Sequence, residues 1–89
     1  MTWHIASLVV RCRTEASAAV IESLNALPHS EVRGAEGARI VVITEAANEF
    51  ELAQRFDAMR AIPGVMTTDL VHHEIDDNES EVAHAQHAP

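Results

Sequence analysis

The chain has 89 residues, of which 47% are hydrophobic, and a formal net charge of -8. A chain of this length forms one small domain, and its composition is ordinary for a globular protein. Six arginines and no lysine stand against fourteen acidic residues, which argues against nucleic acid and anionic membrane surfaces as partners and favours a basic partner. The longest aliphatic run, Ile40 to Ile43, is too short for membrane insertion.

The start of the chain and its single cysteine indicate where the protein works and how it holds together. Residues after Met1 show neither a basic start nor a cleavage site, so we expect the protein in the cytoplasm. Cys12 has no second cysteine for a disulfide or a metal site, and no histidine or lysine stands beside it to activate it. We therefore expect Cys12 to be a small structural residue in a fold held by packing alone.

The first elements expected along the chain are a strand and a helix. The segment Trp3 to Arg11 is rich in aliphatic and β-branched residues, which predicts a strand. Thr14 is a candidate N-cap for a helix whose apolar residues share one face, at Val20, Leu24 and Leu27. Pro28 ends this helix, because proline disfavours helical geometry in the residue before it.

A hairpin is expected next. A short strand from Glu31 to Arg33 leads into the glycine-bracketed turn Gly34 to Gly37. The aliphatic run that follows predicts a longer strand from Arg39 to Glu45.

The remaining elements are a second helix and a last strand. Asn48 followed by Glu51 resembles a capping box, and apolar residues recur behind it at helical spacing, at Leu52, Phe56 and Met59. This helix runs to about Ile62. Pro63 and Gly64 then turn the chain into a strand from Val65 to His73.

Together these elements predict an α+β fold of the ferredoxin-like class. The segments "LNALP" and "MRAIP" form a weak internal repeat in which each ends a helix and precedes a strand. Two β-α-β units in series give a β-α-β-β-α-β sandwich, with a four-stranded antiparallel sheet and both helices on one face. We place this domain at residues 1–75 and an acidic, disordered tail at 76–89. The tail is expected to aid solubility, and an electrostatic lure for a cationic peptide is the alternative.

Two helices can cover only one face of this sheet, so the second face needs an explanation. Side chains alternate across a strand, and the set that contains Leu8, Val42 and Leu70 carries the bulk expected under the helices. The other set is also largely aliphatic, with Ile5, Ser7, Val9, Val41, Ile43, Val65, Thr67, Asp69, Val71 and His73. An exposed apolar patch of this kind marks an interaction site. A sheet-to-sheet homodimer, or scattered valines without any partner, remain alternatives.

Catalytic and metal chemistry have little support in the sequence. His72, His73 and Glu74 resemble metal ligands, but adjacent residues of a strand point to opposite faces, and His84 and His87 would need an ordered tail. We find no nucleophile with its base, no phosphate-binding glycine loop and no carboxylate pair. The sequence thus predicts a binding module that is not an enzyme and has no cofactor and no metal.

Several segments taken together resemble the NapD family, the cytoplasmic assembly chaperones of periplasmic nitrate reductase. They are Trp3, "SLVV" at Ser7 to Val10, "LNALP", "IVV" before "EA", and the closing "GVMTTDLVHHE". The resemblance covers Trp3 to about Glu74. It implies a ferredoxin-like protein that binds the twin-arginine signal peptide of the catalytic subunit NapA and restrains export until the molybdenum cofactor and iron-sulfur cluster are in place.

An aliphatic sheet face flanked by acids suits such a peptide, which has a basic start and an apolar stretch. We expect the floor of the site to be formed by Ile5, Ser7, Val9, Val41, Ile43, Val65, Thr67 and Val71. From the residues alone, Asp69 and Glu45 are candidates to pair with the arginines, and His72 is expected in core or edge packing. A monomer is expected, with a weak dimer as the alternative.

A second class of function also fits the predicted fold. The effector domains of leucine-responsive regulators are ferredoxin-like domains of similar size, which dimerise and bind small amino acids. The alternative is therefore a stand-alone effector-binding dimer that acts as a small-molecule sensor.

Overall fold

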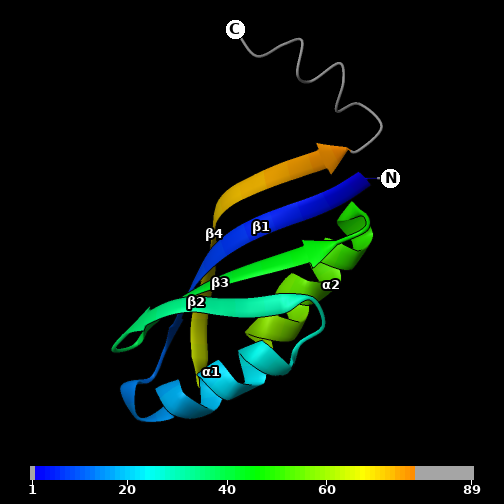
Figure 1. The fold of residues 1–89 in the computed structure, drawn as a ribbon. Helices are drawn as coiled ribbons and strands as arrows, with labels where there is room; N and C mark the ends of the chain where they lie inside the picture. The colour runs from blue at the N-terminus through cyan, green and yellow to red at the C-terminus, as the bar shows by residue number, and fades with distance from the viewer. Residues whose placement is uncertain (1, 78–89) are drawn as a thin grey trace, which may run out of the picture.

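Four runs of aliphatic and β-branched residues form one antiparallel sheet in the computed structural model, which describes residues 2–77 (Figure 1). The strands are β1 (Thr2–Cys12), β2 (Ser30–Glu36), β3 (Arg39–Ala46) and β4 (Val65–Asp77). Their order in the sheet is β2-β3-β1-β4, so β1 and β3 are central and β2 and β4 are edges.

Two helices connect the strands and lie on the same side of the sheet (Figure 1). A short 3-10 turn (Thr14–Ala16) leads into α1 (Ser17–Ala26), and α2 (Glu49–Arg60) joins β3 to β4. This element order and strand order confirm the predicted ferredoxin-like fold. None of the helices within residues 2–77 has the length and apolar character needed to cross a membrane.

The core lies between the helices and one face of the two central strands. The sheet contributes the fully buried Val10, Ile40 and Val42, with Leu8 almost as deep, and the helices contribute Val20, Leu24 and Met59. Cys12 is buried among them and its Sγ lies 3.7 Å from the carbonyl oxygen of Ala38, which confirms its structural role. All the sheet residues of this core share one face by alternation along the strands.

The two helices begin differently. At α2, Asn48 Oδ1 accepts a 2.8 Å hydrogen bond from the Glu51 amide, and Glu51 Oε1 accepts one of 3.2 Å from the Ala47 amide. The predicted capping box is confirmed, with its return bond one residue earlier than the usual pattern. The prediction of Thr14 as an N-cap is wrong. Thr14 begins the 3-10 turn, and neither that turn nor α1 has a side-chain cap.

Two strands extend beyond their predicted ends. Strand β2 continues through Gly34 to Glu36, so the tight turn involves only Gly37 and Ala38, and Gly37 has a left-handed φ of 59°. Strand β4 continues to Asp77, two residues past the predicted end of the domain. The rest of the predicted tail lies outside the described residues.

Strand β4 contains two irregularities in its pairing with β1. The first lies near its start, where Cys12 is paired with Val65 while Arg11 is paired with Thr67. Met66 is therefore an extra residue without a partner. An inserted residue of this kind reverses the faces of the residues on either side of it.

The second irregularity lies in the middle of β4. Leu8 is paired with Leu70 and Ser7 with His72, which leaves Val71 as the extra residue. The side chain of Val71 is exposed. After Val71, the even-numbered residues of β4 point to the face that a regular strand would give to the odd-numbered residues.

These two bulges correct part of the predicted face assignment. Val65 packs against the core beneath the helices instead of facing outward. His73 lies on the helix side, opposite the buried Ala6, and its Nε2 is 3.0 Å from Nδ1 of the buried His4. His72, expected in core or edge packing, is exposed on the other face opposite Ser7.

Candidate functional site

Within residues 2–77, one face of the sheet carries no helix (Figure 1), and we refer to it as the open face. It consists of the odd-numbered residues of β1 from Trp3 to Arg11 and the residues that lie beside them on the other strands. Directly opposed residues of antiparallel strands point to the same side, so the pairing of the strands defines its members. The partners on β3 are Arg39, Val41, Ile43 and Glu45, those on β2 are Glu31, Gly34 and Glu36, and those on β4 are Thr67, Asp69, His72, Glu74 and Asp76.

The middle of the open face is apolar. Val9 lies opposite Val41, and Ser7 lies opposite Ile43, with Ile5 next along β1. These side chains are partly shielded by one another, and Val41 is 40% exposed. They form a continuous aliphatic strip along the two central strands, which is the kind of surface that binds another chain.

The end of the open face near Trp3 is acidic. Ile5 lies between Glu45 on β3 and Glu74 on β4, and Trp3 is paired with Asp76. The ring of Trp3 lies 6.2 Å from that of His29, which precedes β2. Carboxylates therefore flank the apolar strip on both sides at this end.

At the other end, acids and arginines alternate. Arg11 Nε lies 3.9 Å from Asp69 Oδ2, and both side chains are exposed. Glu36 on β2 lies opposite Arg39 on β3. The negative charges here have positive neighbours on the same face.

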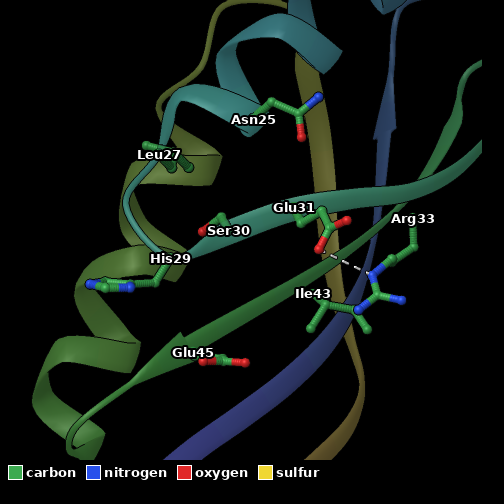
Figure 2. Close-up of a pocket in the computed structure, with 8 residues that line it drawn as sticks. All are labelled: Asn25, Leu27, His29, Ser30, Glu31, Arg33, Ile43 and Glu45. Carbon is green, nitrogen blue, oxygen red and sulfur yellow. Dashed lines mark ion pairs between the residues drawn. The ribbon is translucent and has the colours of Figure 1, made fainter.

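Two hollows follow the β2 edge of the open face. The larger, of about 390 Å³, is lined by Glu31, Arg33, Ile43 and Glu45 together with residues from the end of α1 and the loop after it. Figure 2 shows these side chains on the two neighbouring strands, with the ion pair between Glu31 and Arg33 at 3.4 Å. The second hollow, of about 300 Å³, lies at the other end. A bound peptide could place side chains in both.

The structure brings together most of the predicted site residues. Ile5, Ser7, Val9, Val41, Ile43, Glu45, Thr67 and Asp69 all lie on the open face. Val65 does not, and Val71 is the unpaired residue of the second bulge. Asp69 is beside Arg11, whereas Glu45 forms no ion pair with any other residue in 2–77.

Sequence reasoning missed several acidic and aromatic members of the open face. Glu31, Glu74, Asp76 and the ring of Trp3 border the apolar strip, and their positions depend on strand register. Trp3 has an odd number like Ile5 and Val9, so the alternation of side chains along β1 could have placed it on the same face.

The histidines of β4 are separated by the sheet. His72 Nε2 lies 3.5 Å from Glu74 Oε2 on the open face, while His73 pairs with His4 on the helix side. Residues 2–77 contain no group of three or more side chains of the metal-ligand types placed to hold an ion.

Comparison with known proteins gives consistent matches to one family. The sequence model of the NapD family, described as NapD protein, matches residues 3–77. The chain is 31% identical over 81 residues to chaperone NapD of Escherichia coli strain K12, a match that covers 89% of this chain and 93% of that protein. It is 33% identical over 72 residues to chaperone NapD of Paracoccus pantotrophus, covering 81% of this chain and 64% of the other.

Two solved structures share the fold. The solution structure of the E. coli Tat proofreading chaperone protein NapD matches with a TM-score of 0.75 and 29% identity, over 85% of this chain and 82% of that one. A transcriptional regulatory protein of the ASNC family from Pyrococcus furiosus matches with a TM-score of 0.68 and 20% identity, over 85% and 55% of the two chains. At that identity the second match indicates the fold alone.

Proposed function

This chain belongs to the NapD family of chaperones, and we propose that it binds the twin-arginine signal peptide of NapA, the catalytic subunit of periplasmic nitrate reductase. The family resemblance expected from the sequence is confirmed by the match over residues 3–77. The relatives are chaperones and not enzymes, in agreement with the binding module that we predicted. A similar solved structure is named as a Tat proofreading chaperone, which supports a signal peptide as the ligand.

The observation that carries this proposal is the aliphatic strip of the open face, bordered by acids. A twin-arginine signal peptide combines a basic start with an apolar stretch, and this face offers a surface for each part. Val9, Val41 and Ile43 would contact the apolar stretch, and Glu45 and Glu74 would attract the arginines.

Binding of this kind would explain how the protein restrains export. A signal peptide that lies on the open face is withheld from the export machinery, and its release lets export proceed. The protein would act in the cytoplasm, before the cofactor-loaded subunit crosses the membrane. This role needs reversible binding and no chemical step.

The direct test is a titration of isotope-labelled protein with a synthetic peptide that contains two adjacent arginines followed by an apolar segment. Shifts of backbone amides centred on Ser7, Val9, Val41 and Ile43 would support both the function and the open face. A peptide of the same composition in scrambled order is the matched control, and it should bind at least about tenfold more weakly.

Other outcomes would change the proposal in defined ways. Shifts confined to α1 and α2 would keep the peptide as the ligand and reject the open face. No shifts with the peptide would reject the function. The stand-alone effector-binding dimer has only the shared fold in its favour. Support for this alternative would require a dimer that forms with rising protein concentration and a thermal shift on addition of small amino acids.

A further inference from the structure

The two ends of the open face differ in their charge. At the end near Trp3, the carboxylates of Glu45 and Asp76 form no ion pair with any residue in 2–77, and the nearest basic group to Glu74 is the His72 ring at 3.5 Å. At the other end, Arg11 lies 3.9 Å from Asp69. Among the residues that the structure describes, negative charge is therefore unbalanced at the end near Trp3.

The end away from Trp3 also carries two arginines on the central strands. Arg11 on β1 lies directly opposite Arg39 on β3. An incoming cation at this end would meet two guanidinium groups beside the carboxylates of Asp69 and Glu36. The same cation at the other end would meet Glu45 and Glu74, which flank Ile5 on either side.

The ends are far enough apart to act separately. Ile5 and Arg11 are six positions apart on β1, which corresponds to about 20 Å at ~3.3 Å per residue. This exceeds the screening length of about 8 Å at physiological ionic strength. A charge at one end of a bound peptide is therefore governed by the residues under that end, and the two possible directions of the peptide are not equivalent.

We propose that the open face binds its peptide in a single direction, with the basic amino-terminal residues over Glu45 and Glu74 and the apolar segment along Val9 and Val41 toward Arg11. This inference rests on the proposed function and adds the polarity of the ligand. The larger hollow lies at the same end, where Glu45 lines it beside the ion pair of Glu31 with Arg33, and it gives one guanidinium group a recess next to Glu45. In the opposite direction the peptide arginines would lie beside Arg11 and Arg39, where like charges repel.

The polarity can be measured with the full chain and a spin-labelled peptide. Two versions of a synthetic peptide with two adjacent arginines and an apolar segment carry a nitroxide at the amino or the carboxyl end. We expect the amino-end label to broaden the amide signals of Ile5, Glu45 and Glu74. The carboxyl-end label should broaden those of Arg11, Arg39 and Thr67.

The reverse pattern, or equal broadening of both ends by each label, would overturn the single direction while leaving the peptide as the ligand. Shifts on the open face with the unlabelled peptide separate these outcomes from a failure of the proposed function. If the unlabelled peptide causes no shifts, both the function and the polarity are rejected.

A charge test gives an independent readout. The double variant Glu45→Gln with Glu74→Gln should bind the peptide about five- to tenfold more weakly at low salt. The matched control, Glu22→Gln with Glu49→Gln, removes two acids from the helices and should change affinity less than about twofold. With a peptide in which glutamine replaces both arginines, the first double variant should bind as well as the parent chain. Equal weakening by the two double variants would mean that only overall charge matters, and would overturn the proposal.

Discussion

Val9 and Val41 lie directly opposite each other on β1 and β3, at the centre of the face that no helix covers (Figure 1). An aspartate at position 9 would place a charge under the apolar part of a bound peptide while leaving the helix-side core intact. We expect Val9→Asp to weaken peptide binding by more than about 2 kcal/mol, because the charge loses water at the centre of the interface. Isothermal titration calorimetry of the variant measures this loss.

A control for that experiment is Phe50→Asp. Phe50 is 71% exposed in the first turn of α2, on the other side of the sheet, so a charge there should leave peptide affinity unchanged. Val41→Asp should behave like Val9→Asp. If Val9→Asp binds as tightly as the parent chain while circular dichroism reports a folded domain, the open face is not the binding site.

The paired imidazoles of His4 and His73 lead to a prediction about stability. Their facing nitrogens are 3.0 Å apart and their rings are stacked with centroids 5.3 Å apart. We expect His73→Ala to lower the free energy of unfolding by about 1 kcal/mol, because buried His4 loses its hydrogen-bond partner. Urea denaturation measures the difference, and combining it with His4→Ala in a double-mutant cycle isolates the pairwise contribution.

The neighbouring residue provides the matched control for the histidine pair. His72 is exposed on the open face, so His72→Ala should change stability by less than about 0.5 kcal/mol. A larger loss at position 72 than at position 73 would contradict the second bulge of β4, because that bulge decides which of the two adjacent rings lies on the helix side.

The element order, the core and the uncovered face could be predicted because they depend on local patterns. Periods of about 3.6 in the helices and 2 in the strands identify Leu24 and Val42 as core residues without any knowledge of pairing. The two bulges of β4 could not be predicted. An unpaired residue such as Val71 does not disturb the hydrophobic pattern of the sequence, because the strand has apolar side chains on both faces.

The charges around the site were harder to predict than its apolar floor. Whether an acid lies beside an arginine depends on the register between strands far apart in the sequence. Asp69 and Glu45 were equivalent candidates for pairing with a peptide, yet one lies next to Arg11 and the other does not. Register is determined by tertiary packing and by bulges, and a single sequence gives little information on either.

Gly64 is expected to be essential to the link between α2 and β4. Its φ of 95° is a conformation that other residues rarely adopt, and an added Cβ would come within 2.7 Å of the Ala16 Cβ. We expect Gly64→Ala to destabilise the fold by about 2–4 kcal/mol, since backbone strain and a steric clash act together. Thermal and urea denaturation both report this loss.

Gly34 offers the comparison for this substitution. It lies within β2 with open space around the position of a Cβ, and its φ is not left-handed. Gly34→Ala should therefore leave stability unchanged or raise it by about 0.5 kcal/mol. A similar loss at both glycines would indicate that general loss of chain flexibility, and not the geometry at Gly64, is responsible.

The two helix starts provide the last prediction. Asn48 caps α2 through a 2.8 Å hydrogen bond from the Glu51 amide, whereas the hydroxyl of Thr14 caps nothing at the start of the 3-10 turn. Asn48→Ala should cost about 1 kcal/mol of stability, and Thr14→Ala less than about 0.5 kcal/mol. Denaturant unfolding of the two single variants side by side measures the difference.

The contrast between the two variants tests whether the 3-10 turn replaces a capped helix start. If Thr14→Ala is as costly as Asn48→Ala, the threonine hydroxyl does cap α1 in solution, and the chain enters that helix without the 3-10 turn.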